Sequence, residues 1–402
     1  MRRLRTQVGI VGAGPAGLVL ANALTAAGVD CEVVERGTRQ RVESRSRAGF
    51  LEHRTVAHLR AAGLADRLLA EGVPHGRCEF QCLGRLVHVD YSHHSGGYRH
   101  WAYPQHELVR DLIAALVATG RPPHFGRPAY GVEDGPGAAI RIVCAGLEIH
   151  CDQVVGCDGR RGVAAHRLTA DAGTAVRESR HRHPYDWLAV LADVDRQPTA
   201  IRYAVTADGF AGMMPRAGTR CRFYLQCPPG DTAAYWPHHR IRARLRARLA
   251  TEAAPIPDIG AIHETQVVPM RCRVTEPLRH GVIALAGDAA HLLTPSGAKG
   301  LNLAVADAAD LAAALVAHHR DGDDRALDGY TARRLPDVRR TRAFSDRLLR
   351  LLHLPPGDPA FALRRRLAAI HRLAEPGPRA ADFAHRYAGS GTTRPALAPA
   401  GP

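Results

Sequence analysis

The stretch Val8-Gly-Ile-Val-Gly12-Ala-Gly14-Pro-Ala-Gly17 decides the fold of this chain. The apolar run at residues 8–11 predicts a short buried strand, and the small and aliphatic residues 18–27 predict a helix. Residues 31–34 predict a second strand, which ends in Glu35. Strand, glycine-rich turn, helix and second strand make a βαβ unit, so the sequence predicts a parallel sheet that begins near the N-terminus.

Each glycine of the turn has a physical role in a site for a dinucleotide. Gly12 permits the tight turn, Gly14 lets the backbone approach a pyrophosphate, and Gly17 lets helix and strand pack closely. The helix N-terminus offers N–H groups and the positive end of its dipole to the phosphates. Glu35, 18 residues past Gly17, is placed to accept hydrogen bonds from a ribose diol. The alternative is a glycine-rich packing turn, and the motif alone does not distinguish NAD from FAD.

Length, composition and charge exclude several classes of protein. The chain has 402 residues, 46% of them hydrophobic, which is enough for two or three domains with buried cores. A formal charge of +15 raises nucleic acid, anionic membranes or small anions as partners. Only 5% of residues are aromatic, so a basic protein that binds nucleic acid or other anions is the disfavoured, non-enzyme alternative. Lys299 is the only lysine of the chain.

Cysteine and histidine usage predicts a reducing compartment and no metal centre. The nine cysteines are odd in number and contain no C-x-x-C pair, which disfavours both a disulfide framework and a zinc ribbon. We therefore expect a cytoplasmic protein. His93-His94, His181-x-His183 and His238-His239 lack a cysteine or carboxylate spacing that builds a metal centre, and we interpret them as surface residues.

The N-terminal apolar run needs its own interpretation, because Met1-Arg-Arg-Leu-Arg5 followed by residues 8–29 resembles a signal peptide. We reject this interpretation, since the glycines and Pro15 stand where the dinucleotide-binding turn needs them. No other stretch reaches the roughly 20 apolar residues of a membrane span, so no membrane association is expected.

Three separated segments match one family. The first is the glycine-rich turn with Glu35, the second is Gly156-Cys-Asp158-Gly159, and the third is Ala286-Gly287-Asp288-Ala-Ala-His291. Together they resemble the FAD-dependent aromatic hydroxylases, also called group A flavoprotein monooxygenases. Further segments, within a resemblance that covers residues 6–389, are similar to the para-hydroxybenzoate hydroxylases of that family: Pro295-Ser-Gly-Ala-Lys299-Gly-Leu-Asn302-Leu, Arg45-Ser-Arg47-Ala-Gly, Tyr103-Pro-Gln105 and Tyr203.

The resemblance implies an α/β fold with a Rossmann-like FAD-binding domain, an inserted β-sheet substrate domain and a C-terminal helical region. The β-rich pattern of residues 185–226 and the helical pattern of residues 303–352 agree with it. The expected boundaries are 1–75, 106–180 and 271–315 for the FAD-binding domain, 76–105 for a connecting segment, 181–270 for the substrate domain, 316–388 for the helical interface region and 389–402 for a flexible tail.

The resemblance also assigns residues to FAD. Asp288 is expected at the ribityl chain, and Arg47 and Gln105 at the flavin and its phosphates. A helix that opens at residues 297–302 would direct its N-terminus at the pyrimidine edge of the flavin, where Lys299 would add positive potential. The other expected cofactor contacts are Gly12, Gly14, Gly17, Glu35, Arg36, Asp158, Gly159, Gly300, Leu301 and Asn302.

A phenol reacts far faster as phenolate, so the expected enzyme needs a route that removes a proton from a buried hydroxyl. In the family two tyrosines and a histidine form this route, and Tyr203, Tyr387 and His75 match their positions. Pro295, which precedes the helix that begins near Gly297, completes the expected catalytic set.

The resemblance places the carboxylate of the substrate at Arg216 and Tyr224, where a guanidinium makes charge-assisted contacts. Three residues depart from the family pattern, and they leave the identity of the substrate open. The complete expected substrate set is Arg216, Tyr224, Ser296 and these three departures, Met214, Gly212 and Phe50.

The expected reaction is NAD(P)H- and O2-dependent hydroxylation of 4-hydroxybenzoate to 3,4-dihydroxybenzoate. The alternative is the same chemistry on an amino-substituted ring, 3-amino-4-hydroxybenzoate or 4-aminobenzoate, in a biosynthetic pathway. A flavin halogenase is disfavoured, because the three tryptophans are widely separated in the sequence.

Arginines near the second strand favour NADPH over NADH, since they suit a 2′-phosphate. The resemblance also implies a homodimer. The expected contacts of the nicotinamide cofactor are Arg36, Arg41, Arg45, Arg222 and Arg271.

Overall fold

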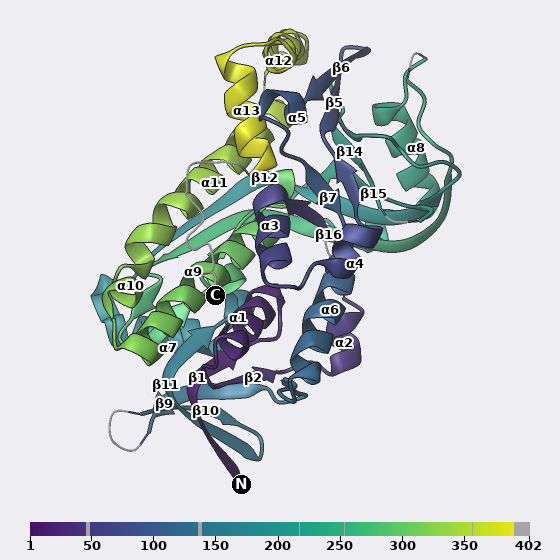
Figure 1. Ribbon diagram of the computed structural model, residues 1–402. Helices are drawn as coiled ribbons and strands as arrows, with labels where there is room; N and C mark the ends of the chain where they lie inside the picture. The colour runs from purple at the N-terminus through teal and green to yellow at the C-terminus, as the bar shows by residue number, and fades with distance from the viewer. Residues whose placement is uncertain (46–48, 136–138, 217, 253, 356, 390–402) are drawn as a thin grey trace.

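The computed structural model describes residues 1–45, 49–135, 139–216, 218–252, 254–355 and 357–389. In the described structure, two large sheets lie at opposite ends of the molecule, and the C-terminal helices run alongside them (Figure 1). The α/β fold that the sequence predicts is confirmed.

The first sheet is built around the predicted βαβ unit. β1 (Arg2–Val11) pairs in parallel with β2 (Cys31–Glu35) on one side and with β11 (Leu147–Gly156) on the other. Helix α1 (Pro15–Ala26) connects β1 to β2. The N-terminal apolar run is therefore a core strand and a core helix, as the rejection of a signal peptide requires.

The remaining strands extend this sheet on both sides. β18 (Ile283–Leu285) adds in parallel to β11, and the hairpin partner of β18 is β17 (Arg279–His280). The other edge is β8 (His124–Phe125), while β9 (Ala129–Asp134) and β10 (Ile140–Cys144) form an antiparallel extension of β11. The carboxyl ends of β1, β11 and β18 meet at one edge, which is where ligands bind in open parallel sheets.

The second sheet is largely antiparallel and has eight strands in the order β19-β16-β12-β15-β14-β13-β5-β6. Its two longest strands run along each other over most of their length and reach from this sheet toward the first one (Figure 1). The strands are β5 (Arg77–Cys82), β6 (Arg85–Asp90), β12 (Arg177–Val194), β13 (Ile201–Thr206), β14 (Gly209–Pro215), β15 (Arg220–Cys227), β16 (Ile259–Glu276) and β19 (His291–Leu292).

A small third sheet joins the two parts of the molecule. β7 (His100–Ala102) pairs with β3 (Phe50–Glu52) on one side and β4 (Val73–His75) on the other. The short helices around it are α2 (Arg39–Glu43), α3 (His53–Ala61), α4 (Asp66–Glu71) and α5 (Tyr91–His94).

The longer helices cover the sheets. α1 packs against α6 (Gln105–Ala118) and α9 (Lys299–Asp321), whereas α8 (His238–Leu249) covers β13 and β14. α7 (Val163–Ala172) and α10 (Arg325–Asp328) are shorter, and α11 (Tyr330–Leu352), α12 (Pro359–Ala374) and α13 (Pro378–Ala388) form the C-terminal region.

One helical segment, Ser296–Asp321, has the length and hydropathy of a membrane span. More than half of its most apolar window is buried inside the protein, and α9 contributes to the same core cluster as α1. Burial against protein explains its apolar composition.

Candidate active site

The glycine-rich turn has the shape that a bound pyrophosphate requires. Gly12 has φ +109°, and a Cβ there would lie 2.4 Å from the carbonyl oxygen of Cys157. A Cβ on Gly17 would lie 2.0 Å from the carbonyl oxygen of Gly12, so both positions exclude a side chain. A Cβ on Gly14 would meet nothing within 4 Å, and no side chain caps the N-terminus of α1. Gly14 and the start of α1 are therefore open to a phosphate, whereas the N–H groups of Gly12 and Ala13 donate to Val34 O and Glu35 Oε2.

Glu35 holds this turn from the end of β2. Its Oε2 accepts a hydrogen bond from Ala13 N at 2.9 Å, and its Oε1 accepts one from Gly37 N at 2.8 Å. Each carboxylate oxygen accepts more than one hydrogen bond, so the group that shapes the turn retains acceptor capacity for a ribose.

Asp158 and Asp288 belong to two short helical segments that the fold brings together: Asp158 immediately precedes one, and Asp288 lies within the other. Asp158 follows β11, and its Oδ2 accepts a hydrogen bond from Ala164 N at 3.2 Å. Its buried Oδ1 has no hydrogen-bond partner among the described residues, and burial raises the pKa of this carboxyl to about 6. Asp288 lies on η4 (Gly287–Ala289), which contacts η1 (Gly159–Arg161). A Cβ on Gly12 would lie 3.0 Å from Asp158 Cα, and a Cβ on Gly287 would lie 3.3 Å from Ala16 Cβ, so both segments lie near the start of α1.

These observations fit FAD. An open glycine-rich turn, an uncapped helix N-terminus and a buried carboxylate oxygen without a partner in the described structure form a polar cradle at the carboxyl ends of the strands. Gln105 begins α6, which packs against α1, and Arg36 follows Glu35 at the surface. Arg47, which the sequence assigns to the flavin, lies outside the described residues.

The turn before α9 is bound tightly to β3. Asn302 Oδ1 accepts a hydrogen bond from Glu52 N at 2.8 Å, and Asn302 Nδ2 donates to Phe50 O at 3.0 Å. Gly297 and Ala298 have φ values of +71° and +54°, which redirect the chain into the helix. A Cβ on Gly300 would meet nothing within 4 Å, and Leu301 is half-buried. Asn302 thus positions the open start of α9.

Lys299 is buried, and its ammonium group is engaged inside the protein. Nζ lies 2.5 Å from Glu52 Oε1 and donates to the carbonyl oxygens of Arg386 and Tyr387, each at 2.7 Å. It also lies 5.1 Å from the centre of the Phe344 ring. Burial lowers the pKa of Lys299, and Glu52 opposes this shift. The ammonium group ties β3, α9 and α13 together, and its predicted effect on a flavin stays a prediction.

Tyr203 and Tyr387 form the pair that the sequence predicts. Their hydroxyl oxygens are 2.8 Å apart, although the residues come from β13 and α13. Both rings are buried in one hydrophobic cluster, and burial raises the pKa of both phenols. The pair can hand a proton from one hydroxyl to the other.

The substrate residues of the second sheet lie in one cross-strand row. Tyr203 is paired with Gly212, and Gly212 with Tyr224, so their side chains share a face of the sheet. Met214 is on the same face, two residues further along β14, and is buried. A Cβ on Gly212 would lie 3.0 Å from Phe210 Cζ. The missing side chain at Gly212 therefore makes room for a neighbouring ring of the protein.

Arg216 has a buried guanidinium group, and no ion pair joins it to a carboxylate among the described residues. Its two terminal nitrogens are buried and make no hydrogen bond within the described chain. Its guanidinium carbon lies 5.3 Å from the centre of the Phe50 ring, and burial lowers the pKa of the group. Since an unpaired buried charge is unfavourable, this site is suited to an anion.

His75 lies close to this region, and it brings a residue that the sequence analysis missed. His75 is opposite His100 on the third sheet, and the Nε2 atoms of both are buried with no hydrogen-bond partner in the part of the chain described. Tyr91 Oη donates to His75 O at 2.5 Å and lies 3.2 Å from His100 Nδ1. The His100 and Tyr387 rings are 5.2 Å apart, centre to centre. Burial lowers the pKa of both histidines.

Pro295 and Ser296 stand just before α9. Ser296 Oγ lies 2.9 Å from Thr294 Oγ1 and donates to Ser345 O at 3.3 Å, so the hydroxyl binds the loop to α11. Pro295 immediately precedes the short helix η5 (Ser296–Ala298).

The five arginines predicted to contact NAD(P)H fall into two groups. Arg36, Arg41 and Arg45 are exposed near the end of β2. Arg222 is buried on β15, where it is paired with Glu264 at 3.0 Å, and Arg271 lies on β16. The first group follows a strand of the first sheet, whereas the second group lies on strands of the second sheet.

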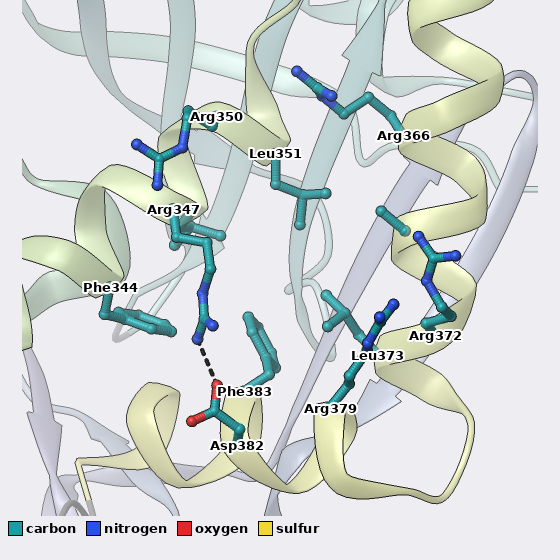
Figure 2. A pocket seen from close by; sticks show the side chains of 12 residues that line it. Phe344, Arg347, Arg350, Leu351, Arg366, Arg372, Leu373, Arg379, Asp382 and Phe383 are labelled. Carbon is teal, nitrogen blue, oxygen red and sulfur yellow. Dashed lines mark hydrogen bonds and ion pairs between the residues drawn. The ribbon is translucent and has the colours of Figure 1, made fainter.

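A separate pocket of about 350 Å³ lies between α11, α12 and α13 (Figure 2). Arginine side chains surround a floor of leucine and phenylalanine, and Arg347 is paired with Asp382 at 2.8 Å. None of the predicted site residues lines it, so it is distinct from the site described above.

One interpretation of the histidines was wrong. His183 is a buried residue of β12, and its Nε2 lies 3.6 Å from Asp346 Oδ1. Cys272 lies in the same cluster. The sequence did not reveal this cluster because its members are far apart along the chain.

Comparison with known proteins agrees with this geometry. A family described as an FAD binding domain matches residues 5–345. The chain is 35% identical to the p-hydroxybenzoate hydroxylase of Acinetobacter baylyi over 356 residues, covering 88% of this chain and 87% of the relative. It is 28% identical to a 3-(3-hydroxy-phenyl)propionate/3-hydroxycinnamic acid hydroxylase of Burkholderia cenocepacia, covering 90% of this chain and 70% of the relative.

The fold is also that of solved structures. p-Nitrophenol 4-monooxygenase of Pseudomonas putida aligns with a TM-score of 0.80 at 20% identity, covering 97% of this chain and 98% of the other. Together with the family match and the 35% identical relative, the cradle at the carboxyl ends of the strands leads to one conclusion. This chain belongs to the FAD-dependent aromatic hydroxylases and is a flavoprotein monooxygenase.

Proposed function

We propose that this enzyme hydroxylates 4-hydroxybenzoate to 3,4-dihydroxybenzoate. The observation that carries the proposal is Arg216, whose buried terminal nitrogens have no hydrogen-bond partner among the described residues. The relative from Acinetobacter baylyi is named a p-hydroxybenzoate hydroxylase, which supports the same substrate.

The spacing on the second sheet suits a benzene ring with substituents at opposite ends. Gly212, the cross-strand neighbour of Tyr203, and Arg216 are four residues apart, about 13 Å along an extended strand. Arg216 binds the carboxylate at one end, while Tyr203 receives the phenol at the other. The Phe50 ring lies under the Arg216 guanidinium and forms one wall of the proposed substrate site.

The residues of the chain then manage the proton of the phenol. The Tyr203 hydroxyl accepts it and passes its own proton to Tyr387, 2.8 Å away. His75 and His100 continue the route: burial lowers the pKa of each and keeps the imidazole neutral, so a proton accepted at Nε2 must be matched by one that the same ring releases toward solvent. FAD, when bound, would accept reducing equivalents from NADPH and activate O2.

A ring with an amino substituent is the second candidate. Met214 is buried on the substrate face, and Phe50 fills space beside Arg216. These two side chains change the shape and polarity of the wall, and they would distinguish 3-amino-4-hydroxybenzoate or 4-aminobenzoate from 4-hydroxybenzoate.

The test is a panel of these three acids with FAD-loaded enzyme, NADPH and O2, read by product mass. We expect a gain of one oxygen atom on 4-hydroxybenzoate, with NADPH oxidation matched to product. Product from only an amino-bearing acid would favour the second candidate, and product from none would refute both.

Three accompanying properties are part of the proposal. NADPH is preferred over NADH, which paired kinetics with the two cofactors would test. The enzyme is a homodimer, and light scattering of the purified protein would give its mass. It resides in the cytoplasm, as fractionation of the source cells would show.

A further inference from the structure

His183, Cys272 and Asp346 form a cluster, and none of the three is among the predicted site residues. Their donor atoms, an imidazole nitrogen, a thiol sulfur and a carboxylate oxygen, all lie within 4.8 Å of one another. His183 Nε2 and Asp346 Oδ1 are buried, and neither has a hydrogen-bond partner in the described residues. The two atoms are 3.6 Å apart, which is within ion-pair distance but too long for a hydrogen bond.

The strand register explains why these residues meet. His181 is directly opposite Cys272 on the β12–β16 ribbon, so both point to one face. His183 shares this face, and its ring lies 4.6 Å from that of His181. Asp346 reaches the cluster from α11, which packs against β16. Three elements thus contribute one donor each.

The donor set has the chemistry of a zinc site. Zn²⁺ is bound by imidazole nitrogen, thiolate sulfur and carboxylate oxygen at about 2.0–2.3 Å, and three protein ligands leave the fourth position to water. Donors at these bond lengths are about 3–4 Å apart in a tetrahedron, so the cluster needs only a small contraction. The exposed side chain of His181 marks the side on which solvent and an ion would enter.

The charges also balance. A thiolate and a carboxylate neutralise a divalent cation, and the thiol proton leaves to solvent when the metal binds. Arg342 Nε lies 3.8 Å from Asp346 Oδ2 and donates through its terminal nitrogen to Ser179 Oγ at 2.7 Å. Arg342 therefore holds the second carboxylate oxygen and leaves Oδ1 for the ion.

We propose that His183, Cys272 and Asp346 bind one Zn²⁺ ion, which fastens α11 to the β12–β16 ribbon. The site is independent of the proposed substrate row, and it gives a stabilising role to a histidine and a cysteine that the hydroxylation chemistry does not use. Because the ion binds the folded state, it raises the unfolding temperature.

The test uses tag-free, FAD-loaded protein that has been treated with chelator, desalted, given Zn²⁺ and desalted again. Metal analysis should find one zinc per chain, and Zn²⁺ should raise the unfolding temperature. His183→Gln, Cys272→Ser and Asp346→Asn should each weaken zinc binding at least tenfold and abolish the thermal shift. Unchanged FAD content shows that each variant folds.

Two matched controls separate this site from adventitious binding. Cys31→Ser removes another buried thiol, and His94→Gln removes a histidine of the His93-His94 pair. Both should retain zinc as the unaltered protein does. Absence of zinc from the unaltered protein, or equal zinc in all variants, would overturn the proposal, whatever the outcome of the hydroxylation assays.

Discussion

Arg216 and Asp158 are two charged residues that we propose as ligand contacts. Each has a buried polar atom with no partner in the described chain, one cationic and one anionic. Such atoms disfavour the folded protein until a ligand arrives. Replacing either residue by a neutral one should therefore stabilise the ligand-free protein and weaken ligand binding.

Arg216→Met should stabilise the ligand-free enzyme, because it removes a buried, unpaired charge. The same change should raise the KM for 4-hydroxybenzoate about 10- to 100-fold, through the loss of charge-assisted hydrogen bonds. Thermal unfolding and steady-state kinetics give the two values. Arg220→Met, at an exposed residue of β15, is the control. An unchanged KM would show that the carboxylate does not bind at Arg216.

Asp158→Asn should change the pH dependence of the FAD-free protein. Burial raises the pKa of Asp158 from 3.8 to about 6, so the folded state holds this proton more tightly than the unfolded state. Ionisation of Asp158 therefore lowers the free energy of unfolding. This loss is absent below pH 4, develops between pH 4 and 6, and amounts to at most about 3 kcal/mol above pH 6.

The variant should therefore be more stable than the unaltered apoprotein above pH 6 and equal to it below pH 4. Denaturant unfolding at a series of pH values measures the difference. The variant should also bind FAD more weakly. A constant difference across this pH range would contradict the account of Asp158.

At the scale of elements, the C-terminal helix α13 completes the site from a distance in sequence. Tyr387 supplies the hydroxyl that meets Tyr203, and its carbonyl oxygen accepts a hydrogen bond from Lys299. The position of α13 therefore depends on the Lys299–Glu52 ion pair between α9 and β3.

Lys299→Met should destabilise the enzyme by about 3–5 kcal/mol, since it leaves Glu52 as a buried, unpaired charge. The double variant Lys299→Met, Glu52→Gln should recover part of this loss. Chemical denaturation of the FAD-loaded protein measures both. Suppose instead that the variant kept its stability and only the reduction potential of the flavin changed. That result would favour the electrostatic role predicted from the sequence over a role of Lys299 in holding β3, α9 and α13 together.

Tyr387→Phe should slow hydroxylation about 100-fold, because it interrupts the route of the phenol proton. FAD content and the rate of flavin reduction should stay close to those of the unaltered enzyme. Rapid-mixing kinetics separate the steps, and Tyr235→Phe, at an exposed tyrosine, is the control. Full hydroxylation by Tyr387→Phe would exclude this proton route.

Local patterns predicted some elements, and contacts between distant segments created the rest. The turn from Gly12 to Gly17 and the acid Glu35 were predictable because a βαβ unit is encoded within one short stretch. Tyr203 and Tyr387 came from family resemblance. His100 was missed, since its sequence neighbours give no sign that β7 places it beside His75.

At the scale of the whole molecule, a small sheet and a few buried polar contacts connect the cofactor side to the substrate side. β3 carries Phe50 toward Arg216 and Glu52 toward Lys299. The proposed zinc cluster would add a third connection, between α11 and the β12–β16 ribbon. The net charge of +15 suits an enzyme whose proposed ligands, FAD, NADPH and an aromatic acid, are all anions.

Anaerobic reduction of the FAD-loaded enzyme by NADPH, followed with and without 4-hydroxybenzoate, tests the central claim most directly. If the aromatic acid occupies the space between Arg216 and the tyrosine pair, it should accelerate flavin reduction, and O2 should then yield 3,4-dihydroxybenzoate. A reduction rate that no 4-hydroxybenzoate-like acid alters would contradict the assignment of this site.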